Sequence, residues 1–248
     1  GNFIGRSGSA IYNYANAYGS SSTRPKAYAS IGNIIGDFIG NYASDNASGG
    51  AIYNYGYAYN GEAMASIGTI TGNFVGNYVG GSGNRGGAIY NYSSSIGTIT
   101  GDFIGNSVTS AVFGKYGSYT YVYNRNYASG GAIHNESGTI NITDSNFIGN
   151  YAQSSGYTGS YAYGGAIYQV GGTLTISDST FGGSEEGQGN SATATNGDAK
   201  GGAIYQEGGT LTISGSTFGG SEEGQGNSAN STNGYAYGGA IYNTSESG

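Results

Sequence analysis

The chain has 248 residues, of which 52 are Gly, and only 8% are charged, with a net charge of −7. The seven Lys and Arg residues are scattered, which argues against the basic stripe of a nucleic-acid-binding protein. The absence of Cys excludes disulfides and thiol chemistry, and no apolar run is long enough to span a membrane. Such a composition is typical of disorder, but ordered repeats along the whole chain overrule that interpretation.

The first predicted strand recurs with the tetrapeptide Gly-Gly-Ala-Ile. A degenerate copy, Gly-Ser-Ala-Ile, occupies residues 8–11, and six copies follow, ending at Ile52, Ile89, Ile133, Ile167, Ile204 and Ile241. Since side chains alternate between the faces of a strand, we expect these Ile side chains inside. The next residue is Tyr in six of the seven copies and His134 in the other, and should form an outward aromatic column.

Two further strand signals follow along each module. Gly-Thr-Ile-Thr occupies residues 68–71 and 97–100, and Gly-Thr-Leu-Thr-Ile-Ser occupies residues 172–177 and 209–214. The pattern Phe-x-x-Asn then recurs at residues 38–41, 74–77, 103–106 and 147–150. Three short strands per module indicate a three-sided coil that buries its apolar face against its neighbours.

These repeats predict an all-β fold, a right-handed parallel β-helix of about six to seven three-strand coils with Tyr-rich loops. We expect one domain over residues 1–248. Residues 1–129 should hold coils with a short third strand and long loops, and residues 130–248 coils with longer strands. Residues 164–200 and 201–237 match at 31 of 37 positions, which indicates a tandem duplication.

Amides recur at the corners of the predicted coils. A buried amide can bond its counterparts in the coils above and below, which would satisfy its polar groups. We therefore expect two ladders of side-chain hydrogen bonds, formed by Asn54, Asn91 and Asn135 and by Asn41, Asn77, Asn106 and Asn150.

The Tyr-rich segments are candidates for an interface. Exposed Tyr offers a large contact area at low entropic cost, and here it alternates with small residues. Packing of these segments on the flank of the solenoid is the alternative. The residues concerned are Tyr55, Tyr57, Tyr59, Tyr119, Tyr121, Tyr123, Tyr161, Tyr163, Tyr235 and Tyr237.

One metal site is conceivable. Glu185 and Glu186 recur as Glu222 and Glu223 on the next coil, and four carboxylates in Gly-rich loops could hold calcium. Two splayed, solvated loops are the alternative. We expect no other cofactor.

The sequence gives little sign of an enzyme. Asp37 and Asp102 would lie on one face about 10 Å apart, but no basic residue recurs beside them. His134 has no nucleophile or orienting acid within the repeat pattern. We therefore expect a non-enzymatic protein.

The paired Gly-Gly-Ala-Ile and Phe-x-x-Asn repeats resemble the passenger domains of chlamydial polymorphic outer membrane proteins. They also resemble, more loosely, adhesin-like right-handed parallel β-helices of bacterial surface proteins. The resemblance implies an extracellular or cell-surface β-helix that serves as an adhesin or structural element. No membrane barrel follows the repeats, so secretion by autotransport is not implied.

Two functions fit the sequence. The chain could be an extracellular fibre or surface-layer subunit that self-associates end to end or laterally, because strand edges at both ends of the repeat array would be uncapped. Alternatively it is a piece of a longer adhesin that binds host or surface glycans. Neither function involves nucleic acid or membrane insertion.

Overall fold

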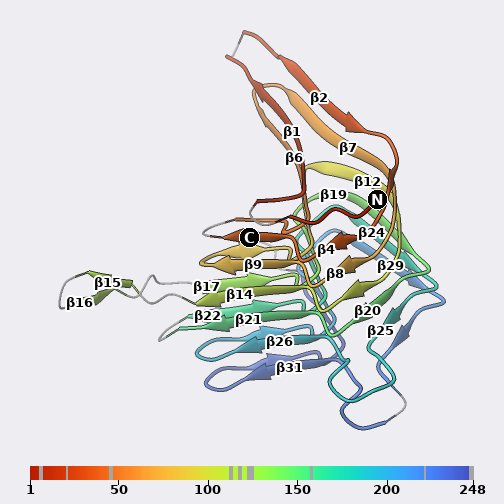
Figure 1. The fold of residues 1–248 in the computed structure, drawn as a ribbon. Coiled ribbons are helices and arrows are strands. Elements are labelled where there is room, and N and C mark those ends of the chain that lie inside the picture. The colour runs from red at the N-terminus through yellow and green to blue at the C-terminus, as the bar shows by residue number, and fades with distance from the viewer. Residues whose placement is uncertain are drawn as a thin grey trace.

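The computed structural model describes residues 1–5, 8–20, 22–44, 47–111, 114–116, 119–121, 126–156, 159–220 and 222–245, and for residues 114–116, 119–121 and 126 the backbone alone. Within these ranges every regular element is a β-strand, and no helix could cross a membrane. The strands form parallel sheets that stack coil upon coil, a β-solenoid (Figure 1). The predicted all-β parallel solenoid is confirmed.

Three of the sheets coincide with the three repeated motifs. The strands that begin at the Ile of each Gly-Gly-Ala-Ile form the Ile sheet: β1 (Ile11–Tyr18), β6 (Ile52–Tyr59), β11 (Ile89–Tyr92), β18 (Ile133–Asn135), β23 (Ile167–Gln169), β28 (Ile204–Gln206) and β33 (Ile241–Asn243). The Thr sheet contains β2 (Lys26–Ile31), β7 (Glu62–Thr71), β12 (Ser94–Thr100), β19 (Gly138–Thr143), β24 (Thr173–Ser177) and β29 (Thr210–Ser214), with β3 (Ile34–Ile35) paired to β7. The Phe sheet contains β4 (Phe38–Ile39), β8 (Phe74–Val75), β13 (Phe103–Ile104), β20 (Asn146–Ile148), β25 (Thr180–Phe181) and β30 (Thr217–Phe218).

Two further parallel sheets lie where the sequence predicted loops, so the coils are not three-stranded. The outer sheet contains β5 (Tyr42–Ser44), β9 (Tyr78–Gly81), β14 (Ser107–Ala111), β21 (Tyr151–Ser155), β26 (Ser191–Ala194) and β31 (Ser228–Ser231). The return sheet contains β10 (Asn84–Arg85), β17 (Asn126–Ser129), β22 (Ser160–Tyr163), β27 (Ala199–Lys200) and β32 (Ala236–Tyr237). Small apolar residues, among them Val79, Val108 and Ala162, form two small core clusters between the outer and return sheets.

The strand that the sequence predicts to be shorter over residues 1–129 belongs to the Thr sheet, and it is not shorter there. β7 has 10 residues, whereas β24 and β29 have five each. β7 is long because, with β1, β2 and β6, it extends into an arm that projects from the stack (Figure 1). Ala15, Ala17 and Ala65 are buried within this arm. β15 (Gly114–Tyr116) and β16 (Tyr119–Tyr121) form a separate antiparallel pair.

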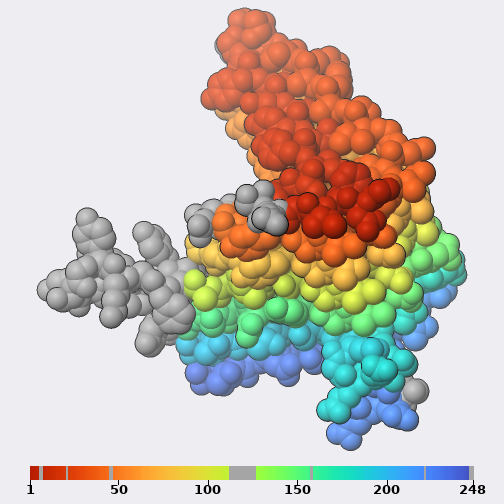
Figure 2. Space-filling model, in the orientation of Figure 1, coloured from red at the N-terminus to blue at the C-terminus, as the bar shows by residue number. Residues whose placement is uncertain are grey.

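The main core is a stack of identical residues in register. Figure 2 shows successive parts of the chain as successive layers of the molecule. The Phe rings of adjacent coils are nearly parallel, with centroids 4.6 Å apart from Phe74 to Phe103 and from Phe103 to Phe147. The Ile residues pair in the same way, Ile89 with both Ile52 and Ile133. The expected burial of Ile89 and Phe103 is confirmed, since both are fully buried.

The Gly-Gly pair is required by the corner before each Ile strand. Gly130 has a φ of +64°, and a Cβ there would collide with the carbonyl oxygen of Ile133. A Cβ on Gly131 would collide with the carbonyl oxygen of Gly165 in the next coil. The first Gly therefore permits the turn, and the second permits the close approach of neighbouring coils.

Both predicted amide ladders are formed by buried side chains. In the first, Asn54 Nδ2 donates to Asn91 Oδ1 at 2.8 Å and Asn91 Nδ2 donates to Asn135 Oδ1 at 2.9 Å. It changes character at Gln169, whose longer side chain donates to the carbonyl oxygens of Gly172 and Thr210 instead.

The second ladder is the longer one. Side-chain hydrogen bonds of 2.8–3.0 Å link Asn41, Asn77, Asn106, Asn150, Asn190 and Asn227 in this order. Each Nδ2 also donates to the carbonyl oxygen of a Phe, as Asn106 does to Phe74 at 2.7 Å. The ladder thus ties each Phe-x-x-Asn corner to the coils on both sides.

Candidate functional site

A groove of about 460 Å³ lies outside the main core, between the Ile sheet and the return sheet. Two columns of side chains meet along it because the Gly-Gly corner turns the chain back on itself. Arg85 and the middle members of both columns line the groove, and the other lining residues are Gly83, Tyr127, Glu136, Val170 and Glu207. One column is the residue that ends each strand of the return sheet: Arg85, Ser129, Tyr163, Lys200 and Tyr237. The other is the residue five positions later, next to each Ile: Tyr90, His134, Tyr168, Tyr205 and Tyr242.

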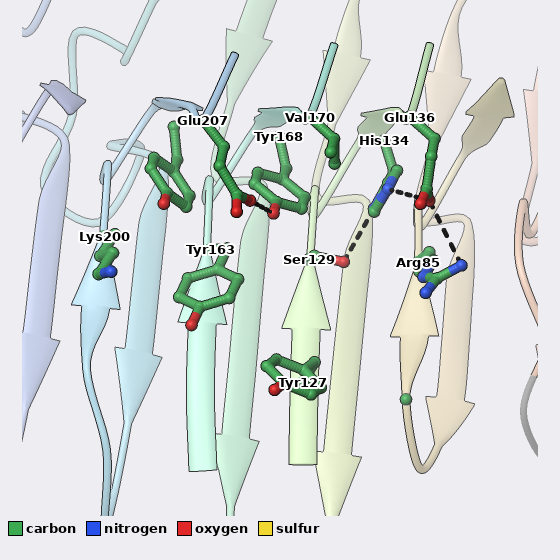
Figure 3. A pocket seen from close by; sticks show the side chains of 12 residues that line it. Arg85, Tyr127, Ser129, His134, Glu136, Tyr163, Tyr168, Val170, Lys200 and Glu207 are labelled. Carbon is green, nitrogen blue, oxygen red and sulfur yellow. Dashed lines mark hydrogen bonds and ion pairs between the residues drawn. The ribbon is translucent and has the colours of Figure 1, made fainter. Parts of the chain in front are cut away.

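The expected outward aromatic column exists, but most of it is covered. Tyr12 is 65% exposed, whereas Tyr90 and Tyr205 are each 2% exposed. The return sheet, which the sequence did not predict, covers this face. The column therefore lines the wall of a groove, where residues from both sheets can act together (Figure 3).

His134 is the centre of a polar cluster at one end of the groove. Ser129 Oγ lies 2.9 Å from His134 Nδ1, and Glu136 Oε2 lies 3.1 Å from His134 Nε2 (Figure 3). Arg85 Nη1 lies 3.3 Å from the same Glu136 oxygen, and the Tyr90 hydroxyl donates to it at 3.3 Å. The expectation that His134 lacks a nearby hydroxyl and acid is therefore wrong.

The geometry fixes the tautomer of His134. Burial lowers its pKa, so the ring is neutral at pH 7, and a carboxylate can only accept a hydrogen bond. Nε2–H therefore donates to Glu136, and Nδ1 accepts from the hydroxyl of Ser129. The hydrogen bond from His134, together with the charge of Arg85 and the hydrogen bond from Tyr90, holds the pKa of Glu136 well below its usual value.

The backbone N–H groups that follow Ser129 bond to the neighbouring coil. Acyl transfer by a serine needs donors aimed at the developing oxyanion, and backbone N–H groups commonly supply them. The N–H groups of Gly130 and Gly131, which follow Ser129, donate to the carbonyl oxygens of Tyr163 and Gly164 in the next coil. These two N–H groups therefore belong to the hydrogen bonds between coils.

The opposite end of the groove is aromatic. Lys200 Nζ lies 5.6 Å from the ring centroids of Tyr163 and Tyr205, and 5.8 and 6.0 Å from those of Tyr242 and Tyr237. Between the two ends, the Tyr168 hydroxyl donates to Glu207 Oε2 (Figure 3). Aromatic faces flanked by charged and hydroxyl groups favour ligands that are polar at their edges and apolar on their faces.

The buried His134 should make the protein sensitive to acid. The pKa of His134 is lowered in the folded state. The stability that the protein gains by burying the neutral ring is therefore fully present above the ordinary pKa of about 6.5, and it is lost as pH falls through the pKa of the folded state. Glu136, also lowered, acts in the same direction below about pH 4.5. We expect His134→Tyr, which restores the common residue of the column, to reduce the loss of thermal stability between about pH 7 and pH 5.

The measurement is the melting temperature of each variant across this pH range. Tyr12→His is the control, because an exposed His in the same column should add no pH dependence. A His134→Tyr protein with the slope of the parent would contradict the role given to His134.

The Tyr residues predicted as loop contacts lie in strands wherever the structure describes them, with one exception. Tyr55, Tyr57 and Tyr59 belong to β6, Tyr161 and Tyr163 to β22, and Tyr237 to β32, whereas Tyr235 precedes β32. Tyr55 stacks on Tyr14 and Tyr92, so part of its contact area is used within the molecule. Tyr119 and Tyr121 lie on β16, where only the backbone is described, and Tyr123 lies outside the described residues.

The four Glu residues considered for calcium do not form a metal site. Glu185, Glu186, Glu222 and Glu223 are all exposed, and they do not form a group of three or more acidic or His side chains that could hold an ion. Glu185 Oε2 instead accepts from Gln188 Nε2 at 3.0 Å, within its own loop. The loops are free to turn their carboxylates toward water, which relieves the repulsion between like charges.

The sequence singled out Tyr163 and the aromatic column, but the charged and hydroxyl residues of the groove were missed because they do not repeat as a type. The position before the Gly-Gly of each Gly-Gly-Ala-Ile holds Ser, Arg, Ser, Tyr, Lys and Tyr in successive coils. The available signal was the spacing, since this position precedes the aromatic column by five residues across a corner that must turn sharply.

The solenoid that the sequence resemblance implies is present, and the specific resemblance to chlamydial passenger domains rests on the two repeated motifs alone. Comparisons of the chain with protein-family models, curated proteins and solved structures found no match.

Proposed function

We propose that this chain is an extracellular structural protein whose solenoids associate end to end through their coils. The observation that carries the proposal is the stacking of like on like, Ile on Ile, Phe on Phe and Asn on Asn, in register along the sheets. The face that one coil turns toward the next coil is therefore nearly the same throughout the solenoid, and so is the opposite face. A first coil can therefore add to the last coil of another copy by strand pairing.

The proposal places the apolar residues of the first and last coils in the joint between copies. Phe3, Ile11, Leu211, Ile213 and Phe218 pack against the main core but remain partly exposed. A second copy would cover them and supply partners for the strand edges. The resemblance of the two repeated motifs to surface passenger domains supports a place outside the cell or on its surface.

Assembly is expected to depend on the core-facing edge residues. We expect the purified chain to form filaments in negative-stain electron micrographs, and Ile11→Lys or Ile241→Lys to yield monomers by light scattering, because a charge would be buried in the joint. Ile4→Lys is the matched control. Ile4 is 72% exposed on the outer face, so this variant should still assemble.

A parent chain that stays monomeric at high concentration would refute assembly. Equal loss of assembly in the Ile4→Lys control would also count against the joint, because it would indicate a general effect of added charge. Filaments that dissolve in salt but resist denaturant would contradict an apolar joint as well.

The groove supports a second function, binding of a saccharide, as in an adhesin. The supporting observation is that Tyr127 and Tyr163, both partly exposed, line the groove together with charged groups at both of its ends. Tyr rings provide faces on which a sugar ring can lie, while Glu136 and Glu207 can accept hydrogen bonds from hydroxyl groups. The saccharide titration at the end of the next subsection is its test.

A further inference from the structure

The charges of the groove are paired within it, with one exception. Arg85 and Glu136 form an ion pair, and Glu207 accepts the hydroxyl of Tyr168. In the part of the chain that the structure describes, no carboxylate lies within 4.0 Å of Lys200 Nζ. The nearby Asp198 accepts instead from the backbone N–H of Tyr235 at 3.2 Å.

Lys200 is surrounded by aromatic rings that stabilise a cation without neutralising it. Its four ring contacts, at 5.6–6.0 Å, come from Tyr163 and Tyr237 of the return sheet and from Tyr205 and Tyr242 of the Ile sheet. Tyr faces attract an ammonium group through their quadrupole but carry no net charge. An incoming anion could therefore bond to Lys200 without breaking an existing ion pair.

We propose that the groove selects acidic saccharides, sugars that bear a carboxylate such as uronic acids, and that Lys200 recognises the carboxylate. The inference rests on the saccharide-binding function proposed above. The sugar ring would lie against the partly exposed rings of Tyr127 and Tyr163 with its carboxylate at Lys200, and the hydroxyl groups of further units would reach Glu207 and the Glu136 cluster. Burial raises the pKa of Tyr163, so its hydroxyl stays protonated and can donate to the same carboxylate.

The tandem duplication restricts this feature to one coil. Its two copies differ at only six positions, and two of these differences fall at the groove, where Val170 and Lys200 correspond to Glu207 and Tyr237. The scaffold thus repeats while the charge of the groove changes. Lys200 forms a single cationic point among Tyr residues, which favours recognition of one carboxylate over binding along a row of charges.

The test is calorimetric titration of the full chain with digalacturonate and with the matched neutral galactose disaccharide. We expect the acidic sugar to bind the parent about tenfold more tightly, the ratio expected for about 1.4 kcal/mol from one charge-assisted contact. Lys200→Gln should bring the two affinities close together. Lys200→Tyr, which copies the next coil, should do the same while keeping the rings packed. Lys26→Gln should leave both affinities unchanged, because Lys26 pairs with Glu62 on the arm.

The possible outcomes separate the two proposals. If neither sugar binds, the saccharide function itself fails and acid recognition fails with it. If both sugars bind the parent equally, saccharide binding stands and the role of Lys200 is refuted. An effect of Lys26→Gln equal to that of Lys200→Gln would also refute it, as would acetate binding as tightly as digalacturonate, since either result would show attraction of anions in general.

Discussion

Replacing Phe103 by Ala is expected to lower the free energy of unfolding by about 3–5 kcal/mol. Phe103 is fully buried, and its ring lies between those of Phe74 and Phe147 at a centroid distance of 4.6 Å on each side. The backbones of these neighbours are held in register by the parallel ladder of the Phe sheet. The surrounding coils therefore cannot collapse into the space that the ring leaves, and the full cost of the cavity should appear.

The measurement is urea-induced unfolding, with amide exchange to locate the effect, because a solenoid can open coil by coil. Ile104→Ala is the matched control. It changes the next residue of the same strand, which faces outward and is 37% exposed, and should cost about 0.5 kcal/mol. A Phe103→Ala protein as stable as this control would contradict the stacked core.

The core could be predicted from the sequence because its residues are large, apolar and repeated at matched positions. The Ile of Gly-Gly-Ala-Ile and the Phe of Phe-x-x-Asn are of this kind, and both stack as expected. The outer and return sheets could not be predicted in this way. Their inward residues, such as Ala43, Val108 and Ala192, are small, and their strands alternate too weakly to stand out from loops.

The groove was beyond the sequence for a different reason. Its chemistry depends on contacts between residues on either side of a corner, as Ser129 makes with His134 across Gly130 and Gly131. A repeat pattern shows which positions are equivalent between coils, but it does not show that two different columns face each other. The return sheet, which the sequence did not predict, brings these two columns face to face.

Replacing Asn106 by Leu is expected to cost about 2–3 kcal/mol, since buried polar groups would lose their partners. Asn106 Oδ1 accepts from the backbone N–H of Asn77 at 3.0 Å and from its side-chain amide at 2.8 Å. Its own Nδ2 donates to Asn150 and to the carbonyl oxygen of Phe74. Leu has a similar volume but neither accepts nor donates, so the loss would come from unpaired groups and not from a cavity.

Thermal and urea unfolding of this variant would measure the cost, with Asn233→Leu as the matched control. Asn233 also donates to an Asn one coil away, Asn196 at 2.8 Å, but this contact is exposed, so water can replace it. The buried ladder should therefore be sensitive to loss of one amide, and the exposed pair should not. Equal stability of the two variants would show that the amides of the Phe-x-x-Asn corners repeat without holding the coils together.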